Sequence, residues 1–184
     1  MAHTPSVDAN YRFIAASQEV NARIQQRQQA LALYVTLVVS LLAALVALKP
    51  GDAAGTAVPV EWLMLGFPTA AVCLAFLNYK AERAITNLRR FLSALEQLDQ
   101  AHERLPSYNT HAQWALGANH ARRFHDYAAA VLVAGGNAVG LGAALKIYPQ
   151  RLAEAPWTLG LAVALSVAAV AVLLLSPRWG FTPE

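Results

Sequence analysis

Four apolar runs, each about as long as the hydrocarbon core of a bilayer is thick, constrain this chain more than any other feature of its sequence. No Asp, Glu, Lys, Arg or His occurs in these runs, which cover residues 30–48, 62–79, 127–145 and 157–175. A run of about 20 apolar residues crosses a membrane as a helix, because a helix satisfies its own backbone hydrogen bonds. The sequence therefore predicts an all-α integral membrane protein with four transmembrane helices in a lipid bilayer.

The composition agrees with a membrane protein. Of the 184 residues, 57% are hydrophobic and 14% are charged, whereas a soluble domain carries about 25% charged residues. The net charge of +3 is too small to predict specific binding of nucleic acid. The chain has one cysteine, Cys73, so it cannot form an intrachain disulfide.

The apolar runs divide the chain into five segments with helical extensions outside the membrane. These are an N-terminal helix (1–29), a first transmembrane hairpin (30–79), a polar helical hairpin (80–126), a second transmembrane hairpin (127–175) and a short tail (176–184). The polar hairpin is the only long polar segment in the interior of the sequence. A signal or a soluble protein partner is therefore expected to act there.

The basic residues predict the side of the membrane that each segment faces. The two short links between paired apolar runs contain three of them, Lys49, Lys146 and Arg151, and the other eleven of the 14 lie in the two ends and the polar hairpin. By the positive-inside rule, both termini and the polar hairpin are cytoplasmic. Trp62 and Trp157 fall at the opposite boundary, where aromatic residues anchor a helix.

The helical extensions follow from capping and breaker signals. Residues 1–7 are expected to be disordered, and Asp8 is the expected N-cap of a helix that runs through residues 9–29 directly into the first apolar run. Pro68 is expected to kink the second crossing. No breaker follows until Pro106, so this helix is predicted to continue to Leu105, about 65 Å from its start.

Apolar residues within the polar hairpin predict that its helices pack. Ile85, Leu88, Leu92 and Leu95 are spaced three, four and three residues apart, as in a coiled-coil seam. After a turn at Pro106, Ser107 and Asn109, a second helix over residues 110–126 carries Trp114, Leu116 and Phe124. These faces need further helices to cover them, which predicts a homo-oligomer.

The third apolar run contains a small-residue motif around Asn137. Gly136 and Gly140 form a GxxxG pattern, and Gly135 and Gly142 add further small positions. Small residues let helices approach closely, and an Asn side chain can hydrogen-bond across the contact. Packing within one chain and packing between subunits both fit this pattern.

No catalytic or metal-binding constellation is evident. His120 and His125 are five residues apart, which does not match metal-ligand spacing on one helix. Arg104 and His111 fit the loose Arg-x(4–6)-His pattern of HEPN ribonucleases, but Pro106 interrupts the helix between them. The absence of ionisable residues from the apolar runs argues against an ion-coupled transporter. We therefore predict a protein that is not an enzyme and that uses no metal or cofactor.

The two transmembrane hairpins share a weak repeat. Residues 21–62 and 119–157 each contain an apolar run ending in Ala-Leu-Lys, then a loop bounded by proline and a tryptophan. Both copies enter from the same side, so a duplication would relate them by an axis along the membrane normal. End signals that any two such hairpins share would produce the same pattern.

The first half of the chain resembles the two-transmembrane SLATT effectors of prokaryotic defence systems. The matching features are the polar lead-in NARIQQRQQALALY, two crossings with a short link, and the charged continuation KAERAITNLRRFLSALEQ. The second pair of crossings is more similar to four-transmembrane accessory proteins of such systems. The resemblance implies a pore-forming or membrane-disrupting effector in the prokaryotic inner membrane, triggered by a soluble partner in antiviral defence. A passive membrane anchor or assembly factor is the alternative.

Overall fold

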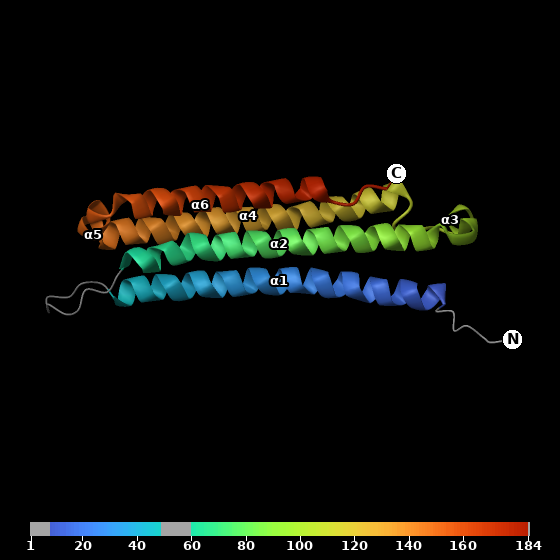
Figure 1. Ribbon diagram of the computed structural model, residues 1–184, viewed down its shortest axis with the longest axis horizontal. Helices are drawn as coiled ribbons and strands as arrows, with labels where there is room; N and C mark the ends of the chain where they lie inside the picture. The colour runs from blue at the N-terminus through green and yellow to red at the C-terminus, as the bar shows by residue number, and fades with distance from the viewer. Residues whose placement is uncertain (1–7, 49–59, 184) are drawn as a thin grey trace.

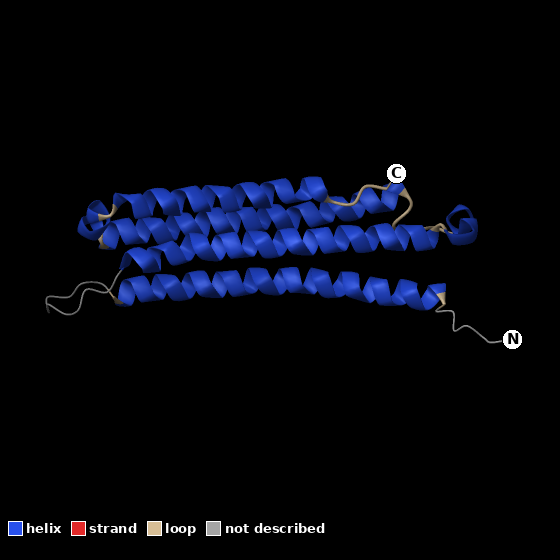
Figure 2. Ribbon diagram, viewed as in Figure 1, coloured by secondary structure: helices blue, strands red, loops and turns tan. Residues whose placement is uncertain are grey.

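The structure is a computed structural model, and it describes residues 8–48 and 60–183. Every regular element among these residues is a helix, as Figure 2 shows. Four of the helices are long and apolar enough to cross a membrane. The predicted class, an all-α membrane protein with four candidate transmembrane helices, is confirmed.

The described residues form four long and four short helices. The long helices are α1 (Ala9–Ala47), α2 (Val60–Glu96), α4 (Ala112–Ile147) and α6 (Pro156–Leu175). The short helices are the 3-10 helix η1 (Leu98–Gln100), α3 (Ala101–Arg104), α5 (Pro149–Glu154) and the 3-10 helix η2 (Ser176–Trp179). α5 lies in the short link between the third and fourth apolar runs.

The four long helices lie side by side, with α2 and α4 between α1 and α6 (Figure 1). Both ends of the described chain lie toward the end that carries the turn between α2 and α4, which we call the hairpin end. α5 lies at the opposite end, the link end. Fully buried apolar side chains from all four long helices fill the interior, among them Leu45, Phe67, Val133 and Leu173.

α1 and α2 each continue from one predicted segment into the next without a break. The Asp8 side chain accepts a hydrogen bond from the backbone N–H of Asn10 at 3.2 Å, which confirms the predicted N-cap. α1 then joins the lead-in segment to the first apolar run, as predicted. α2 continues through Pro68, which lies buried inside it. The expectations for residues 1–7 and for the link at residues 49–59 lie outside the described residues.

The predicted end of α2 is wrong, because the helix ends at Glu96 and not at Leu105. The Glu96 carboxylate accepts hydrogen bonds from the backbone N–H groups of Asn109 and Thr110, both at 2.9 Å, so the returning chain is held at this point. Asp99 and Gln100 then adopt left-handed backbone conformations, with φ of 53° and 57°. At 1.5 Å per residue, α2 is about 55 Å long.

The second helix of the hairpin, the first part of α4, does not bury the face that carries its large apolar residues. It buries a face of small and polar residues instead. α4 begins at Ala112, with Ala115, Asn119 and Asp126 buried. The large apolar residues of this stretch are exposed, by 50% at Trp114, 46% at Leu116 and 76% at Phe124. In the predicted seam on α2, Ile85 and Leu92 are buried, and Leu88 and Leu95 are half-buried.

Candidate functional site

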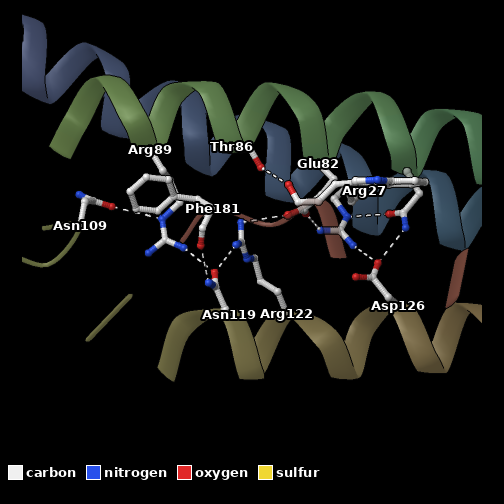
Figure 3. A network of polar contacts seen from close by, with 11 residues as sticks. Arg27, Glu82, Thr86, Arg89, Asn109, Asn119, Arg122, Asp126 and Phe181 are labelled. Carbon is white, nitrogen blue, oxygen red and sulfur yellow. Dashed lines mark hydrogen bonds and ion pairs between the residues drawn. The ribbon is translucent and has the colours of Figure 1, made fainter. Parts of the chain in front are cut away.

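Five polar side chains from three helices form a buried network inside the bundle, which we call the ion cluster (Figure 3). The members are Arg27 of α1, Asn78 and Glu82 of α2, and Arg122 and Asp126 of α4. The Arg27 guanidinium is the centre of the network, because it donates to Asn78 Oδ1 at 2.7 Å, to Glu82 Oε2 at 2.9 Å and to Asp126 Oδ1. It therefore ties α1 to both central helices.

The remaining contacts close the ion cluster between α2 and α4. The Asn78 amide donates to Asp126 Oδ1 at 2.8 Å, and Arg122 Nη1 lies 3.5 Å from Glu82 Oε1 as an ion pair. The Glu82 and Asp126 side chains are only 3% and 2% exposed. Two guanidinium groups face two carboxylates, so the charges balance within the cluster.

The ion cluster lies where the polar part of the bundle meets the apolar spans. Arg27 precedes the first apolar run by three residues, Glu82 follows the second by three, and Asp126 directly precedes the third. Moving two charges out of water costs several kcal/mol per ion, and their attraction repays this cost only when the geometry is good. Charged groups buried at such a level are functional candidates.

The end of the chain folds back onto the same part of the bundle in an arrangement that we call the tail clasp, formed by Thr86, Arg89, Asn119, Trp179 and Phe181. Thr86 Oγ1 donates to the carbonyl of Trp179 at 3.1 Å, and the Asn119 amide donates to the carbonyl of Phe181. The Arg89 guanidinium carbon lies 5.5 Å from the centroid of the Phe181 ring. The tail is therefore fixed to α2 and α4.

Arg89 and Asn119 link the tail clasp to its neighbours. Arg89 donates to Asn119 Oδ1 at 3.0 Å and to Asn109 Oδ1 in the turn at 3.2 Å. Arg122 of the ion cluster also donates to Asn119 Oδ1. Burial lowers the pKa of Arg89, which lies outside the apolar spans, and the nearby Arg122 lowers it further. The polar contacts thus run without interruption from the turn to the ion cluster.

The small-residue motif of α4 faces two other helices of the same chain. A Cβ atom placed on Gly136 would lie 2.9 Å from Tyr34 Oη of α1, and one on Gly140 would lie 2.5 Å from the Phe67 ring of α2. Gly135 and Gly142 have open space at the same position. The close approach at Gly136 and Gly140 is therefore a contact within one chain.

The expected hydrogen bond from Asn137 to another helix is absent among the described residues. Its amide donates instead to the carbonyl of Val133, one turn earlier on α4, at 2.9 Å. Its Oδ1 is buried and has no hydrogen-bond partner in the described part of the chain. The amide is satisfied locally because Val133 offers its carbonyl at the usual i−4 distance.

The remaining sequence candidates stay apart from the ion cluster. Arg104 is the last residue of α3 and His111 is the N-cap of α4, so the two do not share a helix, and both are exposed. Within residues 8–48 and 60–183, no three His, Cys, Asp or Glu side chains gather as metal ligands would.

One pattern in the sequence corresponds to the ion cluster, but it is a pattern of polar residues, which the apolar runs alone do not reveal. On α2, the buried polar residues Asn78, Glu82, Thr86, Arg89 and Ser93 are spaced four, four, three and four residues apart, and so follow one helical face. Such a polar stripe usually marks the face that a helix turns to water. Here α1, α4 and the tail cover it.

No protein-family model matches the chain, and no match is found among the curated proteins or the solved structures compared with it. The arrangement of the ion cluster and of the tail clasp is therefore what bears on function.

Proposed function

We propose that this chain is a non-enzymatic membrane effector subunit in which a soluble partner binds the polar hairpin and changes the packing of the apolar spans. One observation carries the proposal, namely that the ion cluster joins α1, α2 and α4 at the level where the hairpin meets these spans. Buried ion pairs add little net stability, and their best-attested use is to specify a register or a switch. A switch at this level would couple the hairpin to the membrane.

The continuous helices support this coupling. α2 and α4 run from the hairpin into the apolar spans without a break. The tail clasp and the ion cluster connect both helices to the last residues of the chain through Asn119 and Arg122. A displacement of the hairpin would therefore move the membrane-crossing parts of the same helices, because a helix is stiff over this length.

A pore would have to form between copies or by rearrangement. The interior of the bundle is occupied by fully buried side chains such as Leu45, Met64 and Phe67. Large apolar side chains cover the outer faces of the spans, with Phe76 at 65% and Val131 at 71% exposure. These faces suit contact with lipid and with further copies of the chain, so we propose a homo-oligomer as the active form.

Exposed aromatic side chains on the hairpin offer a surface to a soluble partner. Tyr108, Trp114 and Phe124 are 55%, 50% and 76% exposed. Aromatic residues are enriched at protein interfaces, since they bury a large area at a low cost in entropy. The excess of basic residues at this end supports a cytoplasmic location. The resemblance to SLATT effectors supports a role in antiviral defence at the prokaryotic inner membrane.

The alternative is a passive anchor, in which the hairpin docks a partner and the spans do not rearrange. Dye release from vesicles that contain the purified protein separates the two functions. Asp126→Asn removes a charge that Arg27 and Asn78 contact, so an effector held closed by the ion cluster should release dye about tenfold faster, equivalent to a shift of about 1.4 kcal/mol between two packings.

Glu103→Gln is the matched control, because it removes one negative charge from an exposed position of the turn. It should release dye at the wild-type rate. Folded Asp126→Asn protein that leaves the vesicles as tight as protein-free ones would support the anchor and contradict the effector.

A further inference from the structure

A continuous groove runs along the contact between α1 and α2 and is lined by residues of these two helices alone. Its apolar part has a volume of about 540 Å³ and extends along α2 from Trp62 to Leu77. Toward the hairpin end it passes into a basic recess of about 420 Å³. Ala30, Leu33 and Leu77 line both parts, so these form one groove with an apolar and a basic section.

The charged side chains that line the basic recess are all basic. They are Arg23, Arg27 and Lys80, and the amides of Gln26 and Gln29 lie beside them. Arg27 directs its guanidinium into the ion cluster, so Arg23 and Lys80 are the charges that a ligand would meet.

Arg23 has a donor to spare. Its Nη2 pairs with Glu19 and its Nη1 donates to Gln26 at 3.0 Å, and each of these two nitrogens carries a second N–H. The side chain is 33% exposed, so these N–H groups can face the recess. Lys80 is exposed and forms no ion pair with a residue of 8–48 or 60–183. Both groups can therefore bind an anion without first breaking a contact within the bundle.

The length of the groove along α2 matches the thickness of the hydrocarbon core of a bilayer. Trp62 and Lys80 are 18 residues apart on α2, which is about 27 Å along a helix and close to the hydrocarbon thickness of about 30 Å. The basic recess therefore lies at the level of the phosphates of one leaflet, and the apolar part lies in the hydrocarbon. A water-soluble anion would fill only the recess, whereas a phospholipid fits both.

We propose that this groove binds an anionic phospholipid, with the phosphate held by Arg23 and Lys80 and an acyl chain lying along Leu33, Leu37 and Cys73. The charge complementarity of the recess and the apolar lining below it select this occupant. The site does not depend on the proposed function, because it requires neither a soluble partner nor a change in permeability.

Native mass spectrometry of the purified full-length chain tests the proposal, with phosphatidylglycerol and phosphatidylcholine of identical acyl chains as probes. The wild type should retain phosphatidylglycerol about tenfold more, since each Lys or Arg near an anionic lipid adds to binding. The double variant Arg23→Gln/Lys80→Gln should lose this preference. Arg83→Gln/Arg90→Gln removes the same charge from exposed positions of α2 outside the groove and should keep it. Equal losses in both variants, or no preference in the wild type, would overturn the site.

The lone cysteine distinguishes a lipid from a free anion. Cys73 is exposed and lines the apolar part of the groove. Phosphatidylglycerol should slow its reaction with N-ethylmaleimide more than phosphatidylcholine does, and glycerol 3-phosphate, which has no acyl chain, should leave the rate unchanged. Equal rates with both lipids, or slowing by glycerol 3-phosphate, would contradict an acyl chain in the groove.

Discussion

Glu82 is the residue on which the two arginines of the ion cluster converge. Its Oε2 accepts a hydrogen bond from Arg27 of α1 at 2.9 Å, and its Oε1 pairs with Arg122 of α4 at 3.5 Å. The Glu82 side chain is only 3% exposed, so bulk water has little access to the contacts that it makes with the two guanidinium groups. Glu82 therefore supplies part of the negative charge that balances each of the two guanidinium groups.

Replacing this carboxylate should destabilise the fold strongly. Glu82→Gln leaves one uncompensated positive charge inside the bundle, and removing one partner of a buried pair costs about 3–5 kcal/mol. Thermal unfolding in detergent, followed by circular dichroism, should show a clearly lower midpoint than for the wild type. Glu154→Gln, at an exposed position of α5, is the matched control and should unfold like the wild type.

A second variant identifies charge as the cause. Glu82→Gln/Arg122→Gln restores neutrality, since one positive and one negative charge are lost together, and should recover part of the stability. A single Glu82→Gln variant that unfolds at the wild-type temperature would show that the ion pairs do not hold the bundle together.

At the scale of helices, α4 has two faces of small residues with different neighbours. Gly136 and Gly140 are covered by Tyr34 and Phe67. Gly142, two residues beyond Gly140, has open space where a side chain would begin. Phe67 is fully buried, so its ring cannot move aside for an added atom.

This difference predicts opposite effects of the same substitution on the two faces. Gly140→Ala would place Cβ 2.5 Å from the Phe67 ring, and overpacking of this kind costs about 1–3 kcal/mol. Gly142→Ala meets nothing and should be neutral or stabilising by up to about 1 kcal/mol, the helix propensity difference between the residues. Detergent unfolding midpoints measure both, and equal midpoints for the two variants would contradict the packing of α4 on α2.

The helices also show which parts of the fold the sequence makes predictable. The long helices follow from apolar runs without charges and from the lack of breakers, and the cap at Asp8 follows from residue type. The end of α2 does not, because it depends on Glu96 binding backbone N–H groups 13 and 14 residues later. The ion cluster does not either, since the burial of Glu82 requires α1 and α4 to pack over a face that local sequence marks as polar.

At the scale of the whole molecule, polar and apolar contacts separate along the long axis. The turn between α2 and α4 lies at the hairpin end (Figure 1). The tail clasp and then the ion cluster follow toward the middle of the bundle, since Arg27 is midway along α1, and the apolar core continues to the link end. Arg23 and Lys80, which line the basic recess between α1 and α2, lie close to the same boundary in the sequence. Buried and surface charges therefore both mark the level at which the polar part of the bundle meets its apolar spans.

The orientation of this axis in the membrane is open to a direct test. Ser107 in the turn is an unsuitable labelling site because it is buried, whereas Tyr108 is 55% exposed and Glu154 of α5 is exposed at the link end. In a Cys73→Ala background, each position receives a single cysteine. The excess of Lys and Arg at the hairpin end predicts that Glu154→Cys reacts with a membrane-impermeant maleimide in intact cells. Tyr108→Cys should react only after the membrane has been permeabilised. Labelling of Tyr108→Cys in intact cells would place the hairpin outside, beyond the reach of a cytoplasmic partner, and would contradict the proposed effector as well as the orientation.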